Sequence, residues 1–243
     1  MSARLQLEIA AGSLASALAA QAGGADRVEL CENLGEGGCT PSHGTLAAAR
    51  ERLRIPLYVL VRPRGGDFCY DEAEREVMLR DIALCVRLGC DGVVIGALDA
   101  DGEVDRDTCQ ALVAAAGGLG VTFHRAIDVC AEPARALESA IALGCERVLT
   151  SGAHADALAG ADNIAARVAQ AQGRIAVMAG AGIDAGNVGQ IVRRTGVGAV
   201  HASARALRPT MAHARWLPGL SGEVAQTDAS RVRALREALD ALG

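Results

Sequence analysis

Lysine is absent from this sequence, and all 24 of its basic residues are arginine. A lysine amine forms the Schiff base of many carbonyl-group enzymes, and another lysine completes the phosphate-binding P-loop of nucleotide hydrolases. Both classes are therefore excluded. Aromatic residues are also scarce, at 2% of 243 residues, whereas hydrophobic residues make up 51%. We therefore expect a core of aliphatic side chains and alanine.

Clusters of basic residues and long uncharged apolar stretches are missing too. No cluster of basic residues interrupts a chain of net charge −5, which argues against nucleic acid or an anionic membrane as a partner. No stretch of about 20 uncharged apolar residues could cross a bilayer. The first residues lead directly into a predicted strand rather than into a signal peptide. We expect a cytoplasmic protein without nucleic-acid or membrane partners.

No two of the eight cysteines form a C-x-x-C pair, so neither a zinc ribbon nor a thioredoxin-type redox site is indicated. In a cytoplasmic protein most such thiols are expected to be buried and to behave as small hydrophobic side chains. Cys90 and Cys145 occupy the same place in a repeated junction, where a helix ends in glycine and a strand follows. We interpret both as structural.

Short apolar segments alternate with helical patterns along most of the chain. We predict strands at 5–9, 27–31, 55–61, 92–98, 120–125, 147–150, 175–179 and 198–203, and helices at 13–22, 44–53, 71–88, 106–116, 133–143, 156–171 and 184–194. This alternation predicts a single-domain (β/α)8 TIM barrel over residues 1–205. A doubly wound sheet is the alternative, but no G-x-G-x-x-G follows the first strand. Residues 206–243, with Trp216 and a helix at 228–242, are expected to pack against the barrel.

Polar side chains gather at the carboxyl ends of the predicted strands, where TIM-barrel active sites lie. Because side chains alternate along a strand, we expect these polar groups to point into the barrel. The candidates for acid–base chemistry are Glu8, Glu29, His124 and His201. The candidates for substrate binding are Arg62, Arg64, Asp67, Arg125, Thr150 and Ser203, and Cys31 is the candidate metal ligand. The sequence leaves open whether Glu29 and Arg62 form a structural ion pair instead.

Two glycine-containing segments each have two interpretations. In the first, Arg62 to Phe68, the arginines either hold an anionic ligand or pair with Asp67 to fix a loop. In the second, Gly180 to Asp184, a strand leads into a helix, where many barrels bind phosphate. The alternative is a tight turn with Asp184 as the helix cap.

Several ordered blocks make the sequence resemble the CutC family of copper homeostasis proteins. The blocks are Gly23–Cys31, Glu36–Ser42, Arg62–Phe68, Val121–Ala126 and Arg147–Gly152. The resemblance implies a cytoplasmic single-domain barrel that assembles as a homodimer or higher homo-oligomer and binds Cu(I) through cysteine. Cys31 matches one cysteine of that pattern, but Ala10 stands where the family has a cysteine in the first strand.

Three functions follow from these observations. The resemblance implies a copper-binding protein with Cys31 as the ligand. The strand-end side chains favour a barrel enzyme that performs acid–base or metal-assisted chemistry on a small anionic or carbonyl compound. The third possibility is a non-catalytic interaction scaffold. The expected partner is accordingly a small anionic ligand or a metal ion.

Overall fold

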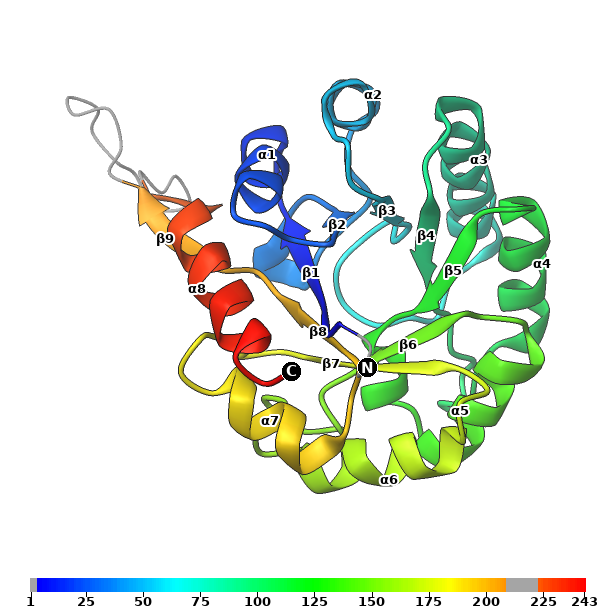
Figure 1. The fold of residues 1–243 in the computed structure, drawn as a ribbon. Helices are drawn as coiled ribbons and strands as arrows, with labels where there is room; N and C mark the ends of the chain where they lie inside the picture. Colours follow the sequence, from blue (N-terminus) through cyan, green and yellow to red (C-terminus); the bar gives the residue numbers. More distant parts are fainter. Residues whose placement is uncertain (1–3, 209–222) are drawn as a thin grey trace.

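The strands of the main sheet pair in the order of the sequence, and the last pairs with the first, so the sheet closes into a parallel barrel (Figure 1). The computed structural model describes residues 4–208 and 223–243. The barrel strands are β1 (Gln6–Ala11), β2 (Arg27–Leu30), β3 (Leu57–Leu60), β4 (Gly92–Ile95), β5 (Gly120–Phe123), β6 (Arg147–Thr150), β7 (Ala176–Gly180) and β8 (Ala199–Ala202). The predicted TIM-barrel fold is confirmed.

Helices connect successive strands and form the outer layer seen in Figure 1. They are α1 (Leu14–Ala22), α2 (His43–Arg52), α3 (Glu72–Leu88), α4 (Arg106–Ala116), α5 (Pro133–Ala142), α6 (Ala161–Ala171) and α7 (Val188–Thr195), with short 3-10 turns η1 (Leu34–Glu36) and η2 (Arg125–Asp128). Local sequence fixes their ends. Asp71 and Glu74 form a capping box before α3, and Gly89 ends it in the left-handed conformation.

Helix α6 starts at Ala161, later than the predicted residue 156. The side chain of Asp156 instead accepts a hydrogen bond from the backbone N–H of Ala159 and holds a separate turn. Close packing adds to this, because a Cβ at Gly152 would lie 2.3 Å from the carbonyl oxygen of Gly160. The local turn chemistry therefore delays the helix.

A charged layer fills the barrel below its carboxyl-end mouth. The guanidinium of Arg27 lies 3.6 Å above the Tyr58 ring and donates hydrogen bonds to Glu8, Glu146 and Thr122. The Tyr58 ring crosses the barrel because the next two strands carry glycine at the facing positions. A Cβ at Gly92 would lie 2.0 Å from that ring. The Tyr58 hydroxyl donates to Glu146 over 2.8 Å, so the layer is closed by hydrogen bonds.

After the barrel the chain forms an antiparallel strand pair, β9 (Arg205–Arg208) and β10 (Val224–Thr227), followed by α8 (Ala229–Asp240). The strand pair was not predicted, whereas the helix was. Helix α8 packs against α1 and α7. Its Arg236 donates hydrogen bonds of 2.9 Å to the Leu5 carbonyl and to the Asp26 carboxylate. Trp216 lies outside the described residues.

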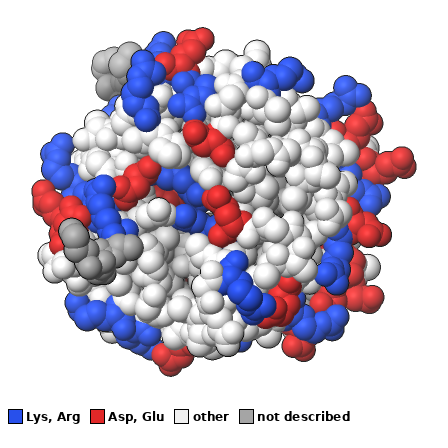
Figure 2. Space-filling model, turned by 45° about the vertical axis from the view of Figure 1, so that its right-hand side comes forward, with Lys and Arg blue, Asp and Glu red and all other residues white. Residues whose placement is uncertain are grey.

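Charged side chains of both signs are interspersed on the face shown in Figure 2, with no broad area of one sign. Many of them pair locally, as Arg174 does with Glu138 and Arg80 with Glu76. Within residues 4–208 and 223–243, no helix has the length and apolar character needed to span a membrane.

Candidate functional site

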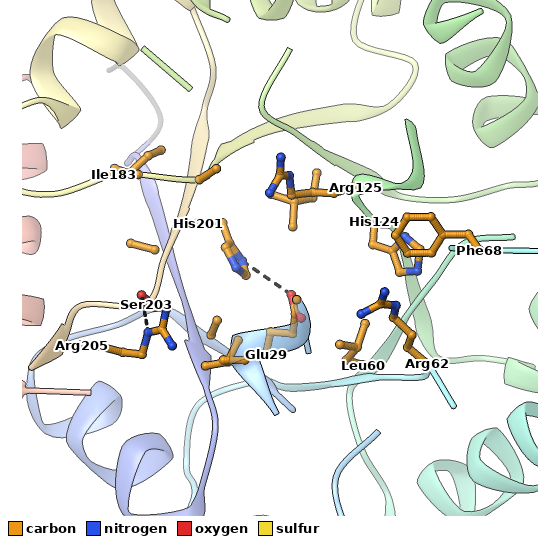
Figure 3. A pocket seen from close by; sticks show the side chains of 17 residues that line it. Glu29, Leu60, Arg62, Phe68, His124, Arg125, Ile183, His201, Ser203 and Arg205 are labelled. Atoms are coloured by element: carbon orange, nitrogen blue, oxygen red, sulfur yellow. Dashed lines mark hydrogen bonds and ion pairs between the residues drawn. The ribbon is translucent and has the colours of Figure 1, made fainter. Parts of the chain in front are cut away.

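A cavity of about 290 Å³ lies at the carboxyl ends of the barrel strands. Its polar lining comes from strands far apart in sequence and includes Glu29, Arg62, His124, Arg125, His201, Ser203 and Arg205 (Figure 3). Apolar side chains such as Leu60, Phe68 and Ile183 complete the wall. The closed barrel thus brings six of the predicted site residues to one cavity.

Two carboxylates and one imidazole form the centre of this site. Glu8 lies next to His201 across the β1–β8 pairing, and its Oε1 is 2.7 Å from His201 Nδ1. Its Oε2 accepts a hydrogen bond from Arg27, so both oxygens of Glu8 are engaged. Glu29 Oε2 lies 3.6 Å from the same His201 nitrogen and makes no hydrogen bond to a described residue. Figure 3 shows Glu29 and His201 facing each other.

The two carboxyl groups have opposite pKa shifts. Burial favours the neutral form of Glu8, but the charges of Arg27 and His201 outweigh it and lower the pKa of Glu8 to about 2. Burial raises the pKa of Glu29 from its ordinary 4.5 to about 7. Burial would lower the pKa of His201, but the charges of Glu29 and Glu8 raise it overall. Glu8 is therefore a permanent anion, whereas Glu29 can gain or lose a proton near neutral pH.

These three residues bring their ligand-type atoms within 4.8 Å of one another, and they are the only such His/Cys/Asp/Glu group in the described part of the chain. Carboxylate oxygen is a hard donor and imidazole nitrogen a borderline one, and both bind divalent cations. However, Glu8 and His201 already satisfy each other, and Arg27 occupies the second Glu8 oxygen. The arrangement is therefore that of an acid–base pair rather than an open metal site.

His124 is a neutral imidazole at the opposite side of the cavity. Its Nδ1 accepts the backbone N–H of Ala126 over 3.2 Å, so its proton is on Nε2, which has no partner in the described structure. Burial, reinforced by the charge of Arg62, lowers the pKa of His124 to about 3. The ring packs against Phe68, with centroids 4.8 Å apart. A neutral N–H donor therefore lines the cavity.

The arginines at the cavity differ in how they are held. Arg62 donates to the carbonyls of Glu36, Gly38 and Gly66, and its guanidinium lies 4.9 Å from the Phe68 ring. It makes no ion pair with Glu29, so the structural pair that the sequence left open is not formed. Arg125 pairs with Asp128 over 2.8 Å and donates to Ser151.

Five predicted residues do not line the cavity: Glu8, which lies beneath it, Cys31, and the three substrate-binding candidates Arg64, Asp67 and Thr150. Arg64 pairs with Asp67 over 3.0 Å and with Glu74, which is the loop-fixing interpretation of this segment. The prediction that Arg64 points into the barrel is wrong because the chain has left the strand before this residue. The prediction for Thr150 is also wrong. Its neighbour Leu149 lines the cavity, and the Thr150 hydroxyl donates instead to Asp128 behind β6.

Cys31 is fully buried in a small apolar cluster and is not among the cavity-lining residues. Its thiol lies 3.7 Å from the carbonyl oxygen of Ala11. Burial, with the nearby charge of Glu29, raises its pKa well above 9.0. The side chain is therefore a neutral thiol at physiological pH.

Sequence reasoning missed the charged layer under the cavity and Arg205 at its rim. Arg27 is two residues before Glu29 on β2 and so shares its inward face, a signal that strand alternation carries. Arg147 opens β6 and donates to Gln6 over 2.6 Å inside the barrel. Arg205 had no comparable signal, because it lies beyond the last predicted strand.

Comparison with known proteins agrees with this fold. The sequence pattern of the CutC family matches residues 5–206. The chain belongs to the CutC family. It is 63% identical to a CutC family protein of Xylella fastidiosa strain Temecula1 over 94% of this chain and 86% of that protein. It is 60% identical to one from Xanthomonas axonopodis pv. citri, over 96% and 98% respectively.

A solved CutC structure from Streptococcus agalactiae, a protein named for copper homeostasis, is 33% identical and has a TM-score of 0.79. It covers 82% of this chain, and the match spans 98% of that chain. The resemblance predicted from the sequence blocks is thereby confirmed. The cytoplasmic location and the homo-oligomeric state of this CutC family member stay predictions.

Proposed function

We propose that this CutC family protein is an enzyme that binds a small anionic carbonyl compound in the barrel mouth and transfers a proton on it. The observation that carries the proposal is Glu29. Its carboxyl is buried and lines a cavity, its Oε2 has no hydrogen-bond partner among the described residues, and its pKa is about 7. A group of that pKa takes up and releases protons at neutral pH, as a general acid–base requires.

The neighbours of Glu29 support the same role. Ionised Glu8 orients His201 through Nδ1 and favours its protonated form, which compensates the charge on Glu29 after proton release. Neutral His124 offers its Nε2–H as a donor to an oxygen on which negative charge develops. Proton abstraction next to a carbonyl needs such a base and such a donor. The reaction class is isomerisation or lyase cleavage without a Schiff base.

Cu(I) binding at Cys31 is the function that the family name suggests, and the side chains do not fit it. Cu(I) takes soft thiolate or thioether ligands. Cys31 is a buried neutral thiol, and no cysteine joins a group of three potential ligands in the described part of the chain. We expect competition with a Cu(I) chelator to give equally weak affinity for wild type and Cys31→Ser. A large loss of affinity in the variant would restore the copper function.

The enzyme proposal is tested by a thermal-shift screen of small anionic and carbonyl compounds, followed by proton NMR in D2O on each stabilising compound. Wild type is expected to exchange a carbon-bound proton of a bound compound for deuterium. Glu29→Gln should bind the compound and lose the exchange by at least 100-fold. Glu51→Gln, an exposed glutamate on α2, is the matched control. Exchange at the wild-type rate in Glu29→Gln would refute the assignment.

A further inference from the structure

The loops after β7 and β8 carry a group of backbone N–H donors that the proposed proton transfer does not use. The N–H groups of Gly182, Ile183, Ser203 and Ala204 find no acceptor among the described residues. Gly182 and Ile183 follow one strand and Ser203 and Ala204 the next, and β7 and β8 are neighbours in the sheet. Gly182, Ile183 and Ser203 line the cavity and Ala204 lines the adjoining hollow, so the four donors belong to one region of the rim.

The backbone here turns sharply and includes three residues with φ in the left-handed region. Ala181 and Gly182 have φ of +79° and +67°, and Ala204 has φ of +46°. Left-handed residues in such turns form concave arrangements of N–H groups that bind anions. Ala181 and Ala204 hold this conformation although alanine, unlike glycine, is disfavoured in it.

Two side chains complete the group. Ser203 and Arg205 line the cavity, and the Arg205 Nε donates to the Ser203 hydroxyl over 3.3 Å. Figure 3 shows both on the side of the cavity where Ile183 lies. Unlike Arg125, Arg205 makes no ion pair with any described carboxylate. It also lines an adjoining hollow of about 630 Å³ toward α8, so its guanidinium lies between two solvent-accessible spaces.

Glu29 lines the same cavity but makes no ion pair with Arg205, and two carboxylates next to the Gly182 loop are engaged in turns. Asp184 accepts the N–H groups of Gly186 and Asn187 and so holds a tight turn, but the prediction that it caps the helix is wrong, because Asn187 is the cap residue and α7 begins at Val188. Asp156 accepts the N–H of Ala159. Both therefore serve local turns, and they leave the guanidinium, the hydroxyl and the four N–H groups without an internal anion.

The geometry points to a phosphate monoester as the ligand, with its phosphoryl group bound by the rim loops Gly182–Ile183 and Ser203–Arg205. A carboxylate has two oxygens in one plane, whereas a phosphoryl group presents three, which suits several N–H donors from two loops and a guanidinium. As applied to a substrate, this inference rests on the proposed function. The substrate is then a small phosphorylated carbonyl compound.

The separation between His201 in β8 and Ser203, the residue that follows β8, sets the size of that substrate. His201 and Ser203 are two residues apart, which corresponds to about 7 Å along a strand. A phosphoryl group at Ser203 therefore places an atom four or five bonds from phosphorus beside His201 and Glu29. A compound of two to four carbons fits this separation and the cavity of about 290 Å³.

Calorimetric titration with phosphoglycolate and with glycolate tests the inference, because the two probes differ only in the phosphoryl group. Wild type should bind phosphoglycolate at least tenfold more tightly than glycolate. Arg205→Gln should weaken phosphoglycolate roughly 10- to 100-fold and Ser203→Ala less. Arg208→Gln, an exposed arginine of the same strand β9, is the matched control.

NMR adds a readout that does not depend on a variant. Inorganic phosphate should shift the backbone amide signals of Gly182 and Ser203 in the wild-type protein. Equal affinity for the two calorimetric probes, wild-type affinity in Arg205→Gln, or unmoved amide signals would each overturn the phosphate site.

The two proposals fail in different ways. Glu29→Gln should keep the affinity for inorganic phosphate within about threefold, because the Glu29 carboxyl does not belong to the phosphoryl site. If phosphate binds as expected but no phosphorylated carbonyl compound exchanges a proton, the enzyme proposal fails alone. If unphosphorylated compounds exchange protons at a rate that Arg205→Gln leaves unchanged, the phosphate site fails alone.

Discussion

Replacement of Glu29 by glutamine should stabilise the protein above neutral pH. The side chain is 7% exposed and has no hydrogen-bond partner for Oε2, so ionisation inside the barrel is costly. The difference between the ordinary pKa of 4.5 and the folded-state pKa of about 7 corresponds to about 3 kcal/mol. Glutamine has nearly the same shape and never ionises, so Glu29→Gln removes this cost.

The sign follows from the protons that each state binds. Between pH 4.5 and 7 the folded protein keeps a proton on Glu29 that the unfolded chain releases, so the wild type loses stability as pH rises through this window. Below pH 4.5 the carboxyl is protonated in both the folded and the unfolded state, so Glu29 does not lower the free energy of unfolding there. The gain of Glu29→Gln over the wild type should therefore grow from pH 4 to pH 8 by at most about 3 kcal/mol.

That value is an upper limit because His201 is coupled to Glu29. The Glu29 charge helps to raise the pKa of His201, so the variant loses part of the stability that protonated His201 contributes. For a chain of this length, about 3 kcal/mol corresponds to roughly 6–12 °C in Tm. Urea unfolding followed by circular dichroism at pH 4, 6 and 8 measures the difference. Glu51→Gln on the surface of α2 is the control.

Parallel pH–stability curves for wild type and Glu29→Gln would refute the reasoning. Such curves would mean that Glu29 ionises in the folded protein as easily as in water, and it could not then act as a neutral-pH proton carrier.

Two further predictions concern the stability of the fold. Gly96→Ala should lower the free energy of unfolding in urea by about 1–3 kcal/mol, because the new Cβ would lie 2.5 Å from the His124 ring. Gly118→Ala is the control: no atom lies within 4 Å of its new Cβ, so it should lower the free energy of unfolding by less than about 1 kcal/mol. Equal costs for the two alanines would contradict the contact. Arg236→Met should lower the free energy of unfolding by about 2 kcal/mol, because it removes the hydrogen bonds to the Leu5 carbonyl and the Asp26 carboxylate. Hydrogen exchange should then speed up in α8, and unchanged protection there would show that these bonds do not hold the helix.

The barrel could be predicted from sequence because each strand is a short apolar run and several helix–strand junctions repeat the same glycine pattern. The inward direction of individual side chains was less predictable. In a strand as short as β6, buried on both faces, Leu149 and Thr150 are both acceptable inside. The actual direction depends on the stagger between strands, which the sequence does not display. Alternation also stops at the strand end, which is why Arg62 lines the cavity and Arg64 does not.

The hydrogen-bond partners and the burial of individual side chains were less predictable still. Glu8 and Glu29 are both glutamates on the inner face of barrel strands, and only the barrel register shows that Arg27 reaches Glu8, whereas Glu29 has only its 3.6 Å contact with His201. The unpaired N–H groups of Gly182 and Ala204 belong to the backbone and have no sequence signature beyond the glycines. A thiol such as Cys31 attracts attention in a sequence, but its burial is visible only in three dimensions.

The guanidinium of Arg27 stacks on the Tyr58 ring, and both donate hydrogen bonds to Glu146. This layer fills the barrel beneath the cavity. The cavity that Glu29 lines therefore lies on the carboxyl-end side of this stack. In the proposed reaction, product leaves through the mouth by which substrate enters, so we expect product to compete with substrate for the cavity.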